Sequence, residues 1–341
     1  MRIGENISKD KLLNIKAYDH RVIIPLFIPS SDGYYQHSFK VFEICINSLN
    51  KTLCLPTKIS VVSNNSEYSI NQRLLEMQNQ GLIDELIIEK EPIGKLNSIL
   101  KVLRNTKERL VTVTDADILF KNNWLKEVLT IMDNFPKAAA VSPLPVFRTQ
   151  NHYTSNIIFD HFFSKKIKFL PVKNPHALTL FAKSVGWSRL DEKWKDVILT
   201  IKNKEQIAVV GCNHCVVTYK TEIFKTIPKQ DSKYLLGGDS EGVYLDKPPL
   251  AVDGYRLSTY DNYAYHLGNT TEEWMYNILN SLKKETVQLN SLKYKVLKEK
   301  PIRNFVKNYV FKKILNKPFV KRFFYKKAGL NPKQLKNFGL S

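Results

Sequence analysis

Short apolar runs alternate with helix-like segments over the first part of the chain. Of all features of the sequence, this alternation most restricts the folds that the chain can adopt. The strand-like runs are residues 22–28, 59–62, 85–89 and 110–113, and the helix-like segments are 39–49, 70–80 and 96–103. The former are β-branched and of strand length, whereas the latter repeat apolar side chains at helical spacing. Strands that alternate with helices predict an α/β fold with a mixed, mainly parallel sheet flanked by helices.

The run at 110–113 ends abruptly at two carboxylates, Asp115 and Asp117. Side chains two residues apart in an extended chain point the same way, so both can face one hard cation. In open α/β sheets, ligands bind at the carboxyl ends of the strands. The sequence therefore predicts a cation and ligand site here. A turn that merely ends the strand is the alternative.

A β-rich start followed by Val-Thr-Asp-Ala-Asp at a strand end (residues 113–117) resembles the nucleotide-sugar site of GT-A-fold glycosyltransferases, particularly the family-2-like group. The resemblance covers roughly residues 20–270 and implies a metal-dependent, inverting transferase that uses a nucleotide sugar, with a UDP-sugar favoured. It implies that Asp117 holds the metal and that Asp115 contacts the ribose or the metal. The expected cofactor is a divalent cation, Mn²⁺ or else Mg²⁺.

Further donor-site residues are expected from the same resemblance. In that family the polar ends of the first two strands hold the nucleoside, so Asn64 or Asn65 would face the base. Lys95, in a Gly-Lys turn, would lie near the nucleotide, although an ordinary loop lysine fits as well. Arg256 would brace a phosphate or an acceptor carboxylate.

The catalytic base and a third metal ligand are expected late in the body. Inverting members of the resembling family have an acidic motif whose aspartate deprotonates the acceptor. The loop at residues 237–241 (Gly-Gly-Asp-Ser-Glu) matches this motif in position, so the resemblance makes Asp239 the candidate base. His266 follows an aromatic strand, and the resemblance implies a metal-ligand role for it. A surface loop at 237–241 and a hydrogen-bonded rim histidine are the alternatives.

Cysteine usage and hydropathy bear on the compartment. Four cysteines in 341 residues suit a reducing compartment, and Cys212 and Cys215 are interpreted as small buried side chains, with a zinc or redox pair as the alternative. No apolar run reaches the roughly 20 residues of a membrane helix. The expected location is the cytoplasm, at the inner face of the cell membrane.

The C-terminal segment is strongly basic. Residues 283–341 contain 17 Lys or Arg against two acids, and so carry +15 of the total net charge of +20. Helical stripes of large apolar residues run through it, at 302–310 and again at 319–324. Such helices predict binding to an anionic membrane surface, whereas a helical appendage packed on the body is the alternative. Nucleic acid is not the expected partner of this segment, because the sequence contains no recognition motif for it.

These features divide the chain into a leader (1–18), a GT-A-like domain (19–275) and a basic amphipathic helical tail (276–341). The domain would consist of a nucleotide-binding half (19–147) and an acceptor half (148–275). The expected acceptor is a hydroxyl of a cell-surface glycan on a lipid carrier. The alternatives are a nucleotidyltransferase and a non-enzymatic basic binding module. Against the former, residues 25–35 hold one glycine and no Lys or Arg.

Overall fold

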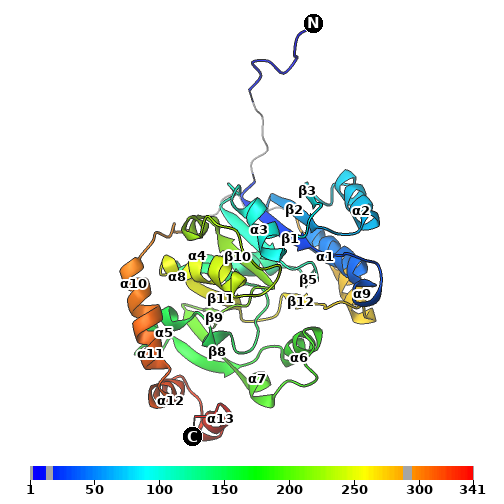
Figure 1. Ribbon diagram of the computed structural model, residues 1–341. Helices are drawn as coiled ribbons and strands as arrows, with labels where there is room; N and C mark the ends of the chain where they lie inside the picture. The colour runs from blue at the N-terminus through cyan, green and yellow to red at the C-terminus, as the bar shows by residue number, and fades with distance from the viewer. Residues whose placement is uncertain (1–2, 13–17, 287–293, 341) are drawn as a thin grey trace.

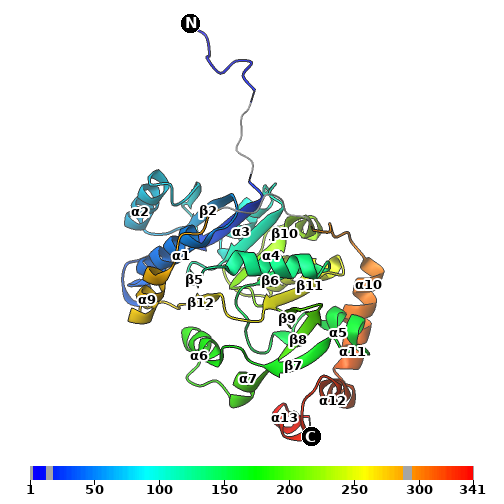
Figure 2. The same cartoon turned by 180° about the vertical axis from the view of Figure 1, so that it is seen from behind.

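The computed structural model describes residues 3–12, 18–286 and 294–340. Its centre is a ten-stranded sheet with helices on both faces (Figures 1 and 2). In spatial order the strands are β3 (Glu85–Glu89), β2 (Thr57–Asn64), β1 (His20–Leu26), β4 (Leu110–Thr114), β10 (Val216–Lys220), β6 (Ala138–Ser142), β11 (Tyr255–Thr259), β9 (Gln206–Val210), β8 (Val197–Asn203) and β7 (Ile167–Pro171).

The strand directions confirm a mixed, mainly parallel sheet. The first four strands in this order are parallel to one another. β10 is antiparallel to both β4 and β6, and β11 is parallel to β6, whereas β9, β8 and β7 continue as an antiparallel extension. Seven of these ten described strands therefore run in one direction. Their carboxyl ends meet at one edge of the sheet, where ligands are expected.

Helices cover the two faces. The helices of the body are α1 (Ser38–Thr52), α2 (Tyr68–Asn79), α3 (Lys95–Leu103), α4 (Trp124–Asn134), α5 (Ser155–His161), α6 (Pro175–Ser184), α7 (Glu192–Asp196), α8 (Lys247–Ala251) and α9 (Glu273–Ser281). Strand β1 is apolar from Val22 to Leu26 because both of its faces are buried: Val22 and Ile24 belong to one core cluster with Phe42 of α1, whereas Ile23 belongs to another with Ile99 of α3. A strand buried on both faces has no polar alternation.

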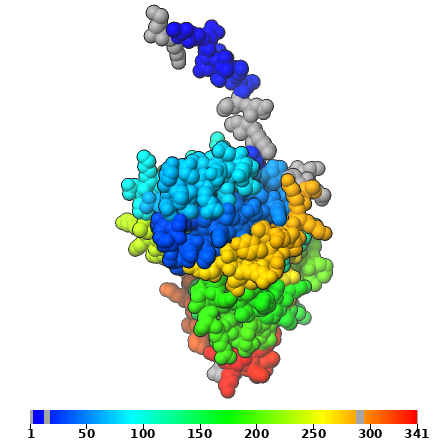
Figure 3. All heavy atoms as spheres, turned by 90° about the vertical axis from the view of Figure 1, so that its right-hand side faces the viewer, coloured from blue at the N-terminus to red at the C-terminus, as the bar shows by residue number. Residues whose placement is uncertain are grey.

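A small second sheet joins distant parts of the chain. Strand β5 (Ile118–Phe120) pairs antiparallel with β12 (Ala264–His266), so that His266 lies opposite Ile118. The backbone N–H of Leu267 donates to the carbonyl of Asp117 at 2.8 Å. Helix α9 lies beside α1 (Figure 3), and Met275 of α9 packs against Leu119 and Leu267. These contacts fix His266 next to the turn that follows β4.

The C-terminal residues form four helices along one side of the body (Figure 1). They are α10 (Pro301–Phe305), α11 (Phe311–Leu315), α12 (Pro318–Lys327) and α13 (Pro332–Asn337), with a π-helical segment, Val306–Val310, linking the first two. Phe311 lies edge-on against Phe159 and Phe162, and Phe324 stacks on Phe162. The tail is therefore packed on α5 through aromatic contacts. None of the described helices has the length and apolarity that a bilayer-crossing segment needs.

Buried charges also hold the tail to the body. The Lys307 ammonium lies 2.6 Å from Asp160 Oδ1 and 2.7 Å from Asp253 Oδ1, and both Lys307 and Asp253 are almost fully buried. Lys137 bridges the same two carboxylates from the body side. Removing one partner from a buried ion pair leaves an uncompensated charge and costs about 3–5 kcal/mol.

We therefore expect Lys307→Met to lower the free energy of unfolding by roughly 3 kcal/mol, because the buried Asp253 loses one of its two close cations. Urea denaturation measures this loss, and limited proteolysis should show earlier cleavage between the tail and the body. The matched control is Lys313→Met, since Lys313 is exposed and forms no ion pair within the described residues. Equal stability of the two variants would contradict the expectation.

Candidate active site

A cavity of about 420 Å³ lies at the carboxyl edge of the parallel strands. Its walls come from the loop after β1, the end of β2, the turn before α3, the turn after β4 and two later loops. The lining residues include Phe27, Tyr34, Tyr35, Asn64, Gly94, Lys95, Asp115, Asp117, Leu235, Leu236, Gly268 and Asn269. We call this the donor cavity. It contains four of the side chains singled out from the sequence.

Asp115 and Lys95 form an ion pair in this cavity. The Lys95 ammonium lies 2.6 Å from Asp115 Oδ1, and 3.8 Å from Glu241 Oε1. Burial by itself lowers the pKa of Lys95, but the charge and hydrogen bond of Asp115 raise it above its usual value. The lysine therefore stays charged in a largely enclosed site. A fixed ammonium at the start of α3, beside the end of β4, is suited to binding an anionic group.

Asp117 lies beside His266, as the pairing of β5 with β12 dictates. His266 Nε2 is 3.3 Å from Asp117 Oδ2, and His266 Nδ1 is 2.9 Å from the hydroxyl of Ser184. Asp117 Oδ1 is buried without a hydrogen-bond partner in the described part of the chain. Burial raises the pKa of Asp117, and the neighbouring His266 acts in the opposite direction. A buried carboxylate oxygen without a partner is suited to a cation.

A divalent cation fits this group of side chains. Ligand atoms of Asp115, Cys215 and His266 lie within 4.8 Å of one another, and Asp117 adjoins His266. The structure thus brings together the three predicted metal ligands, Asp115, Asp117 and His266; their role stays a prediction. Two carboxylates and an imidazole suit Mn²⁺ or Mg²⁺, whereas a thiolate would favour a softer ion. Burial raises the pKa of Cys215, which keeps its thiol protonated.

The position of Cys215 beside the acidic pair was not predicted from the sequence. The cause is the antiparallel pairing of β10 with β4, which sets Val216 opposite Thr114 and lets the Asp115 N–H donate to the Cys215 carbonyl. The periodicity of a sequence does not show that a later strand inserts between earlier strands in the opposite direction. Cys212 is buried, as expected, while Cys215 is half-buried and both thiols are free.

The two asparagines separate in the structure. Asn64 lines the donor cavity, and its Oδ1 accepts a hydrogen bond from the Ile93 N–H. Asn65 has a φ of 58° in the left-handed region and is not among the lining residues. Of the two alternatives, only Asn64 lies where a nucleoside could reach it. Phe27 and Tyr34 add partly exposed aromatic walls, which could stack on a base.

A second cavity, of about 570 Å³, lies further along the sheet. We call it the acceptor cavity. It is lined by His152, Tyr153, Trp187, Asn213, His214, Asp239, Glu241, Asp246 and Arg256, among others. Asp239 is 61% exposed, and its Oδ2 lies 3.0 Å from the Lys247 ammonium. Glu241 is 17% exposed and connects the two cavities, because its carboxylate lies near Lys95.

Arg256 lies in the acceptor cavity and not with the donor-site residues among which it was predicted. It is on β11, which β10 and β6 separate from β4. Its guanidinium is buried, forms an ion pair with Asp246 and donates to the Cys212 carbonyl. This position separates Arg256 from the donor cavity, and its expected binding of the nucleotide sugar stays a prediction. Contact with an acceptor carboxylate, the other expectation, is compatible with this place.

A histidine–aspartate pair in the acceptor cavity was missed by sequence reasoning. His214 Nδ1 lies 3.5 Å from Asp246 Oδ2, and hydrogen bonding to Asp246 raises the pKa of His214. Asp246 ends a π-helical segment, Gly242–Asp246, which turns its carboxylate toward both His214 and Arg256. The only available signal was the Cys-Asn-His-Cys run at 212–215, which indicated metal or redox chemistry instead.

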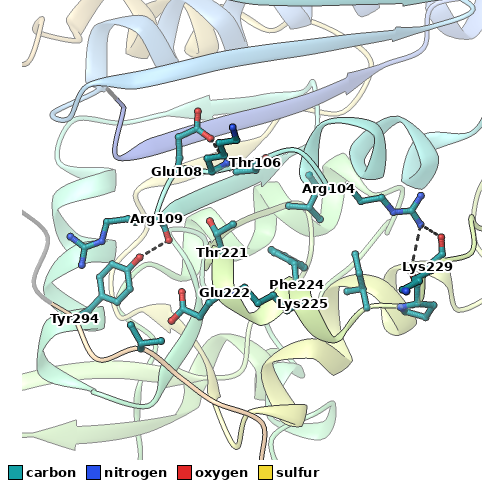
Figure 4. A pocket seen from close by; sticks show the side chains of 15 residues that line it. Arg104, Thr106, Glu108, Arg109, Thr221, Glu222, Phe224, Lys225, Lys229 and Tyr294 are labelled. Atoms are coloured by element: carbon teal, nitrogen blue, oxygen red, sulfur yellow. Dashed lines mark hydrogen bonds between the residues drawn. The ribbon is translucent and has the colours of Figure 1, made fainter. Parts of the chain in front are cut away.

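A third, larger cavity of about 770 Å³ lies at the opposite edge of the sheet (Figure 4). Arg109 precedes β4 and Thr221 follows the antiparallel β10, so both lie at the amino-terminal end of β4. The Tyr294 hydroxyl donates to the Arg109 carbonyl at 2.5 Å (Figure 4). None of the predicted site residues lines this cavity. The chemistry expected from the sequence is therefore confined to the donor and acceptor cavities.

Comparison with solved structures gives distant likenesses. The chain is similar to the mannosyltransferase PcManGT from Pyrobaculum calidifontis in complex with GDP-Man and Mn²⁺, with 14% identity, coverage of 96% of this chain and 76% of that chain, and a TM-score of 0.42. It is also similar to S. aureus TarS, with 14% identity, coverage of 76% and 38%, and a TM-score of 0.40. A third similar structure is S. aureus TarS 1–349 in complex with UDP, with 13% identity, coverage of 76% of this chain and 63% of that chain, and a TM-score of 0.41. No curated protein sequence matches the chain.

The sequence itself matches a family model. Residues 34–187 match the model described as glycosyl transferase family 2. The matched segment contains Asn64, Lys95, Asp115 and Asp117, and it ends before Asp239 and His266. It therefore includes the strand ends that form most of the donor cavity in the mixed, mainly parallel sheet. The matched segment is under half of the chain, and together with the mixed, mainly parallel sheet it supports a family-2-like glycosyltransferase.

Proposed function

We propose that the protein moves a sugar from a UDP-sugar to a hydroxyl of a cell-surface glycan, with inversion at the anomeric carbon and with help from a divalent cation, Mn²⁺ in preference to Mg²⁺. The observation that carries this proposal is the adjacency of two sites. Lys95, Asp115 and Asp117 line the donor cavity with His266 beside Asp117, and Glu241 links this group to the acceptor cavity that contains Asp239.

Donor binding would use the charged groups at the strand ends. Asp117, Asp115 and His266 would hold the cation, and the Lys95 ammonium would bind the diphosphate. When bound, the cation neutralises charge that develops on the departing diphosphate. Asn64 and the aromatic walls at Phe27 and Tyr34 would hold the nucleoside. The large, partly exposed ring of Tyr34 offers a surface on which a base can stack.

Transfer would then take place between the two cavities. Asp239 would accept the proton of the acceptor hydroxyl as its oxygen attacks the anomeric carbon. The bond from that carbon to the diphosphate oxygen breaks as the new glycosidic bond forms, and the electron pair leaves with the diphosphate. In-line attack from the opposite face inverts the anomeric carbon. Lys247, 3.0 Å from Asp239 Oδ2, holds the base at the edge of the acceptor cavity.

The arrangement also supports the proposed division of the chain. Most donor-cavity residues come from 19–147, and most acceptor-cavity residues come from 148–275. The exceptions are informative, because Leu235, Leu236, Gly268 and Asn269 extend from the second half over the donor cavity. The two halves would therefore act as one catalytic domain, with 276–341 as a separate helical tail that works at the inner face of the cell membrane.

A thermal-shift measurement tests the donor site directly. UDP, GDP, CDP and AMP are compared, each with Mn²⁺ or with EDTA. We expect UDP with Mn²⁺ to raise the melting temperature, since a ligand at 100 times its Kd stabilises the native state by about 2.7 kcal/mol. EDTA should remove most of this shift. No shift with any nucleotide would overturn the donor site, and a larger shift with another nucleotide would replace UDP.

A further inference from the structure

The tail exposes a continuous strip of large apolar side chains. The apolar strip consists of Ile302, Phe305, Val306, Tyr309 and Val310 on the helix through α10, with Phe319 and Phe323 added by α12. The first five follow the 3, 4, 7, 8 spacing that gathers side chains on one helical face. Ile302 is 79% exposed and Phe319 is 70% exposed. Apolar patches of this kind mark an interaction surface.

The strip is not left over from poor packing of the tail. The other face of the same helices already contacts the body through Phe311, Leu315 and Phe324, and through the buried ammonium of Lys307. These helices therefore have two apolar faces with different occupants. One face holds the tail on α5. Of the strip residues, Phe323 also stacks on Phe162 at the margin of that contact, whereas Ile302 and Phe319 are largely exposed.

Charge identifies the partner that fits the strip. The exposed cations around it are Arg303, Lys312, Lys313, Lys317 and Arg322. Among them only Arg303 forms an ion pair in the described residues, with Asp253 at 3.7 Å. Between 294 and 340 the sequence contains a single acid, Glu299. Apolar and aromatic side chains flanked by unpaired cations suit the headgroup region of an anionic bilayer. A second copy of this chain would bring the same positive charge.

The strip also adjoins the acceptor cavity. The Lys300 N–H donates to the Ala251 carbonyl of α8, which places the start of α10 beside that helix. Asp246, the residue directly before α8, lines the acceptor cavity. The cavity and the strip thus meet at α8 and the helix through α10.

We propose that the apolar strip binds an anionic membrane surface and so holds α8 and the neighbouring acceptor cavity close to that surface, and that the acceptor is a membrane-anchored glycan whose polar head enters the cavity. This inference rests on the proposed transfer reaction for the role of the cavity, but the membrane contact stands on the strip alone. A water-soluble glycan would gain nothing from this arrangement. A lipid-anchored glycan would reach the acceptor cavity directly, because the cavity would lie at the membrane surface that holds the lipid.

Vesicle co-sedimentation tests the contact. We expect the full chain to bind phosphatidylcholine vesicles that contain phosphatidylglycerol at least about tenfold more tightly than pure phosphatidylcholine, with binding weakened by salt. Phe305→Ser/Tyr309→Ser should lose about tenfold or more of that binding. The matched control is Tyr68→Ser/Leu75→Ser, which removes two exposed apolar side chains from α2. Equal binding by both double variants, or no preference for the anionic vesicles, would overturn the proposal.

A second measurement tests the orientation. A fluorophore is attached at Lys247→Cys, beside the acceptor cavity, or at Tyr68→Cys on α2, and spin-labelled headgroups serve as quenchers. We expect quenching at position 247 and little at 68; the reverse would overturn the placement of the cavity. Size-exclusion chromatography of the strip variant covers self-association: a dimer that Phe305→Ser/Tyr309→Ser dissolves, without vesicle binding, would show a second copy to be the occupant. Nucleotide-dependent thermal shifts on the same samples report separately on the transfer site.

Discussion

Asp117→Asn is expected to lower kcat/KM for sugar transfer on the order of 10³-fold, equivalent to about 4 kcal/mol of transition-state stabilisation. The neutral amide keeps the shape of the side chain but withdraws a negative charge from the group that would hold the cation. Asp117 Oδ1 is buried without a hydrogen-bond partner in the described part of the chain, so its charge is the one most directly available to the cation. Initial rates over a range of Mn²⁺ concentrations measure the effect, and a partial recovery at high Mn²⁺ is expected.

The control for this change is Asp133→Asn, the same substitution on an exposed position of α4. It should transfer sugar at the wild-type rate. Asp117→Asn should also lose the Mn²⁺-dependent part of the thermal shift with UDP, whereas Asp133→Asn should keep it. If Asp117→Asn retained full activity and full metal dependence, the cation would have to be held elsewhere, and Asp115 with Cys215 and His266 would be the remaining group within reach.

Asp239→Asn is expected to lower kcat by about 10²- to 10⁴-fold, the range that a general base contributes, while donor binding stays unchanged. Asp239 lines the acceptor cavity and not the donor cavity, so its charge has no direct part in holding the nucleotide. Single-turnover transfer rates, together with UDP titrations by calorimetry, separate these two effects. A large loss of UDP affinity would contradict the assignment of Asp239 as a base.

Glu241→Gln is the matched comparison for the base. Glu241 is less exposed than Asp239 and lies 3.8 Å from the Lys95 ammonium, so its removal should weaken donor binding more than it slows the chemical step. The two variants should therefore differ in kind: Asp239→Asn in kcat, Glu241→Gln in the KM for the donor. If Glu241→Gln abolished transfer and Asp239→Asn did not, the base would be Glu241.

The sequence predicted those parts of the fold that local patterns determine. The apolar run at 22–28 corresponds to β1, and the helix-like segment at 70–80 corresponds to α2, which Gly81 follows with a φ of 74°. The acidic pair lies at the end of β4, as expected. The alternation of strands and helices also led to the correct fold class. These features depend on a few adjacent residues.

Features that depend on distant contacts could not be predicted. Residues 147–205 showed no usable spacing, and the structure explains why: Phe162 and Phe169 in this segment pack against Phe324 and Tyr325 of the tail. In the tail, the helices are as expected, but the stripe at 302–310 faces outward while other residues bind the body. The pairing of distant strands was not predictable either: the register of β10 with β4 sets Cys215 beside Asp115, and the strand order sets Arg256 in the acceptor cavity.

The pairing of β12 with β5 has a consequence for the synthesis of the protein. On a ribosome, β1 to β4 and the Asp115–Asp117 turn emerge first and can begin to fold, whereas His266 emerges about 150 residues after Asp117. Until then, a nascent chain lacks β12, the strand that pairs with β5, and the loop at Gly268 that lines the donor cavity. We therefore expect the donor cavity to reach its final shape only after residue 269 has emerged.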